Sequence, residues 1–258
     1  MMRIFNSFKI AVAMYSKIPI GRTEWTKENM EYSMCFVPFI GMVTGALSVA
    51  WWCLCTTLGF EKLFFACVAV LIPLCITGGI HMDGFCDVVD AMSSYEVVEK
   101  KLEILKDPHI GAFALIWTVA YFVGLIGAFS QLHSLEGAII IGIGYVVSRA
   151  VVCLLAITLK NAKREGTLYT FSSRQKKGAV AAILWIFIIM CLASMFIVNY
   201  KIAVLTAFAC GIWTILFCNM SKKNFGGITG DLAGYFIQMC ELVIAFAVIL
   251  GETLCSYL

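Results

Sequence analysis

Charged residues are scarce in this sequence. Only 14% of its 258 residues are Asp, Glu, Lys or Arg, whereas 61% are hydrophobic, and the mean hydropathy is +0.92. Soluble globular domains carry about a quarter charged residues, so the composition excludes that class and indicates a membrane protein. No polar linker is long enough to divide the chain, which predicts one integral-membrane catalytic domain over residues 1–258.

Motifs typical of several other classes are also missing. The 12 cysteines form no paired CxxC sets, which argues against zinc and leaves them as small hydrophobic residues. No basic segment interleaved with aromatic residues indicates a nucleic-acid partner. Residues 1–33 lack the small-residue cleavage site of a signal peptide. They predict a cytoplasmic or interfacial segment whose amphipathic helix ends before Pro19.

Long apolar stretches occupy most of the chain. A hydrocarbon core of about 30 Å requires ~20 apolar residues per helix, and seven stretches reach or approach that length. The predicted fold class is therefore an all-α polytopic membrane protein, a bundle of about seven transmembrane helices. The seven stretches are Met34–Leu58, Leu63–Ile80, Ile110–Leu132, Gly137–Leu159, Ala179–Val198, Ile202–Met220 and Asp231–Leu250.

Basic residues lie almost entirely on one side of these stretches. With the N-terminus inside, all but three of the 19 Lys and Arg residues fall in inside segments. The exceptions are Lys62 and Lys201, in outside turns, and Arg149, within a span. Lys and Arg accumulate in cytoplasmic loops, which predicts an N-in, C-out topology in the inner (cytoplasmic) membrane. The long polar segments then share the cytoplasmic face, where we expect the active site.

Three carboxylates follow the second apolar stretch. Asp83, Asp87 and Asp90 are spaced i, i+4 and i+7, so at about 100° per residue they share one helical face. Like charges at this spacing destabilise a helix, and no Lys or Arg follows before Lys100. Mg²⁺ binds carboxylate oxygens together with substrate phosphates, so the pattern predicts a Mg²⁺ site. A solvated acidic face is the alternative.

Other charged residues stand at unusual positions. Arg149 lies inside the fourth span, where an ionisable residue is a functional candidate; it would neutralise a buried carboxylate or bind a phosphate. Glu241, in the last span, lies deep enough to require a partner. Asp107 precedes Pro108 and either caps a helix that begins there or adds a fourth carboxylate to the cytoplasmic mouth.

A glycine-rich segment, Gly226–Gly230, leads into the last span. Its glycines allow a ligand to approach the backbone closely, and the N-terminus of the following helix favours an anion. Thr229 or Asp231 is either the N-cap of that helix or part of the site. Because Asp231 lies on the same predicted side of the membrane as the three aspartates, we expect one shared site.

These segments occur together, and in the same order, in one known family. Over nearly its whole length the chain resembles the cobalamin synthases, also called adenosylcobinamide-GDP ribazoletransferases. The acidic and glycine-rich segments are specific as a pair, whereas Gln238 departs from the family, in which an acid is usual. The similar segments are Phe36–Gly41, Gly78–Asp90, Lys106–Phe113, Ser148–Arg149, Ala162–Gly166 and Gly227–Asp231.

The resemblance implies the final nucleotide-loop assembly step of cobalamin biosynthesis. Adenosylcobinamide-GDP and α-ribazole (or its 5′-phosphate) would give adenosylcobalamin (or its 5′-phosphate) and GMP, with Mg²⁺ as cofactor. The sequence leaves both a monomer and a homo-oligomer as alternatives. Together the patterns and the resemblance assign three metal ligands, Asp83, Asp87 and Asp90. They also assign ten catalytic or substrate-binding residues, which include Asp83 and Asp87. They are Asp83, Asp87, Arg149 and Asp231 for catalysis, and His81, Asp107, Arg164, Gly227, Thr229 and Gly230 for substrate binding.

Other classes use similar residues. CDP-alcohol phosphotransferases and intramembrane aromatic prenyltransferases also bind Mg²⁺ through Asp-rich motifs. However, no Ala-Arg follows Asp83-Gly84, as the first class requires, and no Asn precedes the motif where the second class has one. An ion-coupled secondary transporter is the third alternative, with Asp231, Glu241 and Arg149 along its ion path. Inverted repeats would favour a transporter, and none is evident in the sequence.

Overall fold

Helices make up nearly all of the protein in the computed structural model, which describes residues 2–163 and 165–257. Within these ranges there is no β-strand, and one isolated bridge joins Asn161 to Ile228. The predicted all-α class is confirmed. The helices are α1 (Met2–Tyr15), α2 (Lys27–Met30), the 3-10 helix η1 (Ser33–Phe36), α3 (Val37–Leu58), α4 (Lys62–Ala69), α5 (Leu71–Thr77), α6 (Ile80–Ser93), α7 (Val98–Ile104), α8 (Ala112–Ser130), α9 (Leu135–Thr158), α10 (Thr167–Arg174), α11 (Lys177–Val198), α12 (Tyr200–Phe225) and α13 (Gly230–Tyr257).

Six helical segments in the described ranges are long and apolar enough to cross a membrane. They contain α3, α8, α9, α11, α12 and α13, which match six of the seven predicted spans. A bent pair, Lys62–Thr77 followed by Ile80–Ser93, is the candidate for the seventh, and it turns by 97° at its break. The chain is therefore a multi-pass membrane protein, and its shortest predicted span is the one that is broken.

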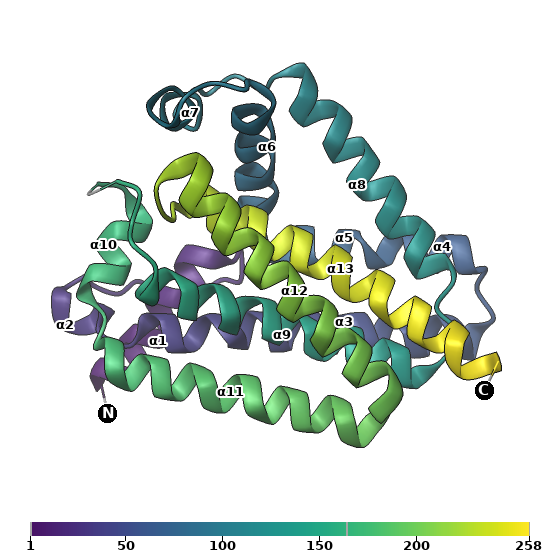
Figure 1. Ribbon diagram of the computed structural model, residues 1–258. Coiled ribbons are helices and arrows are strands. Elements are labelled where there is room, and N and C mark those ends of the chain that lie inside the picture. The colour runs from purple at the N-terminus through teal and green to yellow at the C-terminus, as the bar shows by residue number, and fades with distance from the viewer. Residues whose placement is uncertain (1, 164, 258) are drawn as a thin grey trace.

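The central helix of the bundle is α9 (Figure 1). In its most apolar window 78% of the residues are buried, against 28% in α8 and α11 and 22% in α12. The outer helices instead expose large apolar side chains such as Trp117, Trp185 and Phe208. A soluble protein does not leave a belt of this kind in water, so we expect these side chains to contact lipid.

Two consecutive glycines cause the break between α5 and α6. Gly78 and Gly79 have φ values of 66° and 83°, in the left-handed region that residues other than glycine rarely adopt. The chain therefore turns sharply after Thr77, and α6 runs steeply across the direction of the long helices (Figure 1). This turn carries the aspartates of α6 to one end of the bundle.

The N-terminal helix α1 begins with an exposed turn and becomes buried further along. Ile10 and Ala11 are fully buried, whereas Met2, Ile4 and Phe5 are more than half exposed. The helix ends at Tyr15, before Pro19, which confirms the predicted helix but does not test its position at the membrane interface. Its buried face packs on α2, η1 and α3, so α1 closes one wall of the bundle near the polar loops.

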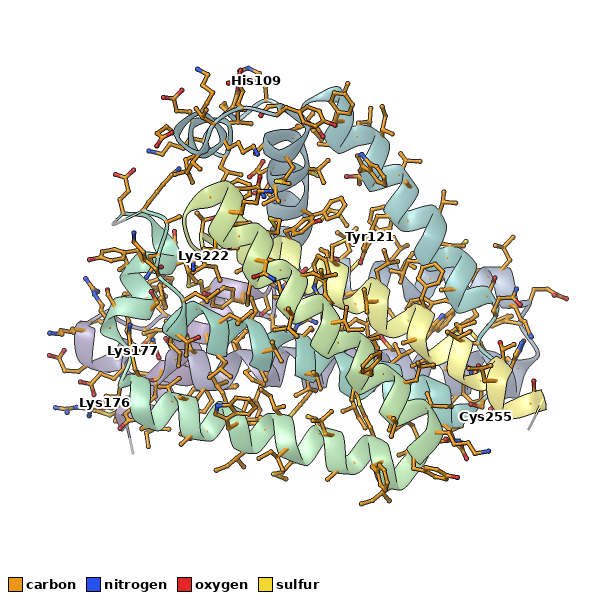
Figure 2. The ribbon with its side chains drawn as sticks, viewed as in Figure 1. His109, Tyr121, Lys176, Lys177, Lys222 and Cys255 are labelled. Atoms are coloured by element: carbon orange, nitrogen blue, oxygen red, sulfur yellow. The ribbon has the colours of Figure 1, made fainter. Side chains whose placement is uncertain are left out.

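The polar loops share one end of the bundle. Lys176, Lys177 and Lys222 lie towards this end, whereas Cys255 lies at the opposite end, beside the short turns (Figure 2). This distribution is the one that the basic residues of the sequence predicted. All 12 cysteines are free.

We expect the lysine-rich end to face the cytoplasm. In a cysteine-free background, Lys223→Cys should resist a membrane-impermeant maleimide in intact cells, whereas Gln131→Cys should react. Both native side chains are exposed, at opposite ends of the bundle, so the membrane alone distinguishes them, and permeabilised cells provide the control. Labelling of Lys223→Cys from outside would reverse the predicted topology.

Candidate active site

Helices α6 and α13 cross at backbone contact. A Cβ atom added to Gly84 would lie 2.6 Å from the carbonyl oxygen of Asp231, and one added to Gly234 would lie 2.9 Å from the carbonyl oxygen of His81. Only glycine fits at such distances, as in other close helix crossings built on small residues. The crossing thereby brings the start of α6, with Asp83, beside the first turn of α13, with Asp231.

Asp83, Asp87 and Asp231 form an acidic cluster at this crossing. The charges of Asp231 and Asp83 both act on Asp87, and no ion pair among the described residues includes a member of the cluster. The charge of Lys163 acts on Asp231 from the loop after α9, but the three neighbouring carboxylates still repel one another, and this repulsion favours a bound cation. The predicted grouping of α6 aspartates with Asp231 is thus present in the fold.

The acidic cluster is not a preformed metal cage. Among residues 2–163 and 165–257, no three His, Cys, Asp or Glu side chains converge closely enough to hold a metal ion. Mg²⁺ usually takes only one or two protein carboxylates and completes its shell with water and substrate phosphates. The hard oxygen donors of Asp83, Asp87 and Asp231 fit an ion that arrives with a phosphate, and Mg²⁺ binding stays a prediction.

Asp90, the third predicted metal ligand, is engaged elsewhere. Its carboxylate accepts hydrogen bonds from the backbone N–H groups of Gly111, at 2.6 Å, and Ala114, at 2.9 Å. These donors lie at the N-terminus of α8, where backbone N–H groups lack helical partners. Asp90 therefore caps α8 from a different helix, and both of its oxygens are already hydrogen-bonded.

This capping role predicts a stability effect for Asp90. Asp90→Ala should cost about 1–3 kcal/mol, because it removes a charged acceptor from two backbone donors. Asp90→Asn keeps one oxygen acceptor and should cost less, with most turnover retained. Thermal unfolding in detergent and GMP release measure the two effects. An Asp90→Asn protein of native stability without turnover would instead support the metal-ligand prediction.

The glycine-rich segment pairs with the loop after α9. The N–H of Ile228 donates to the carbonyl of Lys160 at 2.9 Å, and the N–H of Ala162 donates to the carbonyl of Ile228 at 3.0 Å. Gly227 lies against the Lys160 carbonyl, where a Cβ atom would clash. The close approach that Gly227 permits here is to this loop of the protein itself, and the predicted approach of a ligand stays a prediction.

Thr229 is the N-cap of α13. Its hydroxyl accepts the N–H of Leu232 at 3.2 Å and lies 3.4 Å from the carboxylate of Asp231. Of the two candidate caps, the structure uses Thr229, so the Asp231 carboxylate is not needed to cap the helix. Gly230 and Asp231 in the first turn instead line the space in front of the helix.

Two cavities meet at the start of α13. The larger one, which we call the polar cavity, has a volume of about 350 Å³ and is lined by Lys106, Lys163, Glu165 and Thr229, among others. The apolar cavity, of about 180 Å³, lies between α1, α9 and the α6–α13 crossing. Both are also lined by Thr167, Leu168, Gly230 and Asp231. Asp231 is the one member of the acidic cluster that lines both.

Two lysines line the polar cavity together with two carboxylates, those of Glu165 and Asp231. The Lys106 ammonium contacts Glu165 at 2.7 Å, and the Lys163 ammonium donates to the carbonyl of Leu102 at 2.6 Å. Burial and the nearby charge of Lys106 lower the pKa of Lys163, while Asp231 opposes that shift. Neither lysine has a role predicted from the sequence, although both lie in segments that carry the family resemblance.

Arg149 neutralises a buried carboxylate. Its guanidinium forms an ion pair with Glu241 and donates to the carbonyl of Tyr145 at 3.1 Å and to the hydroxyl of Ser148 at 2.9 Å. Both ion-pair members are nearly inaccessible, and Arg149 lines neither cavity. Of the two roles predicted for Arg149, the structure favours pairing, which also supplies the partner that Glu241 requires. No contact of Arg149 supports the predicted catalytic role.

The other predicted residues divide between cavity and periphery. His81 is buried and lines the apolar cavity, whereas Arg164 lies outside the described residues. Asp107 is exposed and accepts the backbone N–H of His109 at 3.0 Å and its ring Nδ1 at 2.7 Å; these bonds lower the pKa of Asp107. The prediction that Asp107 caps a helix from Pro108 is wrong, because α8 begins at Ala112 and Asp90 caps it.

Gln238, which departs from the family pattern, has a structural partner. Its side-chain oxygen accepts the hydroxyl of Tyr121 at 2.7 Å, and Tyr121 points from α8 towards the interior of the bundle (Figure 2). Both residues are buried, so this hydrogen bond satisfies two polar groups away from the site. The amide therefore needs no role in chemistry.

Comparisons with known proteins agree on one family. The cobalamin-5-phosphate synthase model matches residues 7–249. A protein of Lachnoclostridium phytofermentans named adenosylcobinamide-GDP ribazoletransferase is 40% identical over 99% of this chain and 98% of its own length. Proteins of the same name from Clostridium perfringens and Clostridium botulinum are each 31% identical, over 93% and 96% of this chain and 96% and 98% of their own lengths. No solved structure matches the chain.

Proposed function

Because the chain belongs to the cobalamin-5-phosphate synthase family, we propose that it is an adenosylcobinamide-GDP ribazoletransferase. A hydroxyl oxygen of α-ribazole, or of its 5′-phosphate, bonds to the phosphorus that carries the cobinamide. The anhydride oxygen leaves with GMP, and the hydroxyl proton passes to a base. The product is adenosylcobalamin or its 5′-phosphate.

One observation carries this proposal: Asp231, a member of the acidic cluster, lines both a lysine-lined cavity and an apolar one. A phosphoanhydride needs cationic neutralisation, and its acceptor needs a base within reach. The polar cavity suits the diphosphate, because Lys163 and the N-terminus of α13 present positive potential there, and Lys106 lies in the same lining in an ion pair with Glu165. A transporter requires no such combination of anion site and carboxylates.

The carboxylates divide two tasks between them. Asp231 lines both cavities, so its oxygens can reach a hydroxyl presented from one cavity to a phosphorus held in the other. We assign proton acceptance to Asp231 on that basis. Asp83 and Asp87 do not line the polar cavity themselves; they would hold Mg²⁺ beside Asp231, at the edge of the space that the diphosphate occupies. When bound, the ion would neutralise the phosphate oxygens and the charge of the leaving GMP.

The orientation of the site follows from the distribution of charge. We place the acidic cluster and the lysine-lined cavity on the cytoplasmic side of the inner membrane, because they share the end of the bundle that carries nearly all basic residues. Those residues also attract anionic substrates.

Lys163 is expected to bind the diphosphate. Lys163→Gln should raise the KM for adenosylcobinamide-GDP about tenfold or more, because a hydrogen bond to a charged group contributes roughly 1.5–3 kcal/mol. The KM for α-ribazole should change little. Lys223→Gln, an exposed lysine at the same end of the bundle but outside both cavities, is the matched control. Equal effects of the two substitutions would show that Lys163 acts only as part of the general surface charge and does not bind the diphosphate.

The direct test is a reconstituted assay. Purified protein in lipid vesicles is incubated with adenosylcobinamide-GDP and α-ribazole, and GMP and the corrinoid product are quantified. We expect GMP only when both substrates are present, loss of activity with EDTA, and recovery with excess Mg²⁺. A transporter releases no GMP. Activity that survives EDTA would support the transferase assignment and contradict the Mg²⁺ requirement.

A further inference from the structure

The apolar cavity has a composition unlike that of the polar cavity. Met34, Val37, Val152, Ala156 and Ile237 contribute apolar walls. Its charged and titratable groups from α6 and α13 are His81 and the carboxylates of Asp83 and Asp231, while Tyr15, Cys153 and Thr167 add single polar atoms from other elements. Small-molecule sites typically combine apolar walls with a few convergent polar groups. The cavity is therefore suited to an apolar group attached to a polar one.

Its volume limits the size of that group. A cavity of about 150 Å³ holds a benzene ring, so about 180 Å³ accepts a small aromatic ring system. A corrinoid ring or a complete nucleotide is too large. A guanosine diphosphate would also leave its charges against apolar walls, at a high desolvation cost.

We infer that the apolar cavity binds the aromatic base of α-ribazole, with the attached ribose directed towards Asp231. This assignment rests on the proposed function and extends it to one substrate and one cavity. The base buries its rings between α1, α9 and α13, and His81 supplies a polar edge. The ribose then lies where the two cavities meet, between Asp231 and a diphosphate in the polar cavity.

This arrangement makes the apolar cavity the determinant of base specificity. One methyl group more or less in an apolar pocket typically changes kcat/KM for a substrate about 10- to 200-fold. Filling the cavity should therefore act against a larger base more strongly than against a smaller one. A site that bound only the ribose and the diphosphate would not distinguish bases in this way.

Ala156→Leu tests the assignment by filling the cavity from α9. We expect at least a tenfold rise in KM for α-ribazole, whose base is 5,6-dimethylbenzimidazole, and a smaller rise for the riboside of unsubstituted benzimidazole. The KM for adenosylcobinamide-GDP should stay within about twofold. Ala207→Leu, a half-buried alanine of α12 that lines neither cavity, is the matched control and should behave as the native protein.

Met14→Ala provides a second test that does not crowd the core. Met14 is half-buried on α1 and lines the same cavity, so its truncation should improve kcat/KM about tenfold for a riboside with a three-ring base. This variant decides the matter alone if Ala156→Leu fails to accumulate in membranes.

The outcomes separate this inference from the proposed function. Native protein that releases no GMP overturns the proposed function itself. Native activity with base-dependent changes in the two variants supports the base cavity. The base cavity is overturned if the native protein is active, the KM for α-ribazole is unchanged in an Ala156→Leu protein that accumulates, and Met14→Ala shows no gain in kcat/KM. The cavity would then hold another apolar group such as a lipid chain. A rise confined to adenosylcobinamide-GDP also overturns the base cavity.

Discussion

Asp83→Asn and Asp87→Asn are each expected to lower the rate of GMP release at least about 100-fold, with normal amounts of protein in the membrane. Both residues belong to the acidic cluster at the α6–α13 crossing, and neither has an ion-pair partner among the described residues. Removing one negative ligand weakens the binding of the cation that neutralises the diphosphate. Such charge stabilisation contributes several kcal/mol to phosphoryl transfer.

The measurement is GMP release as a function of Mg²⁺ concentration. A lost ligand should shift the Mg²⁺ midpoint upwards as well as lowering the rate, whereas a purely structural residue would not move the midpoint. Glu96→Gln, which neutralises an exposed carboxylate just beyond α6, is the matched control and should retain native kinetics. Native turnover in both Asp83→Asn and Asp87→Asn would remove the metal from the acidic cluster.

Composition and periodicity were sufficient to predict the spans and the acidic face. Apolar runs reveal transmembrane helices because lipid requires them to be apolar along their whole length. The same method predicted the stretch 63–80 as a plain span, since hydropathy does not register backbone dihedral angles. Gly78 and Gly79 carried the missing signal, because adjacent glycines permit the left-handed turn that ends this stretch and separates it from α6.

Side-chain partners between distant segments were beyond sequence reasoning. Arg149 and Glu241 form their ion pair from two different spans, and each was identified only as needing some partner. Asp90 shared a helical face with Asp83, but a shared face does not show that α8 would begin beside Asp90. Spacing along one helix therefore predicted three equivalent carboxylates, and packing between helices assigned them different tasks.

The cavity lysines show the same limit. A basic loop after a transmembrane span is expected from topology alone, so Lys163 carried no distinguishing pattern. Its role depends on the pairing of that loop with Ile228, which holds Lys163 beside the start of α13. Only the three-dimensional arrangement distinguishes it from exposed lysines such as Lys223.

Asp231→Asn is expected to remove most turnover without destabilising the fold. Asn has nearly the shape of Asp but cannot accept the hydroxyl proton, so kcat should fall at least about 100-fold if Asp231 is the base. The α13 cap does not depend on Asp231, because the Thr229 hydroxyl accepts the N–H of Leu232. Thr229→Ala should instead cost about 0.5–2 kcal/mol of stability, as the loss of an N-cap does.

Stability is the measurement that distinguishes a functional carboxylate from a structural one here. The acidic cluster places like charges together, so in the absence of a bound cation its members repel one another. Neutralising Asp231 relieves that repulsion, and the thermal midpoint of Asp231→Asn in EDTA should equal or exceed that of the native protein. Residues held for function often lower stability in this way. A fully active Asp231→Asn protein, or one that is inactive only because it unfolds, would return Asp231 to a structural role.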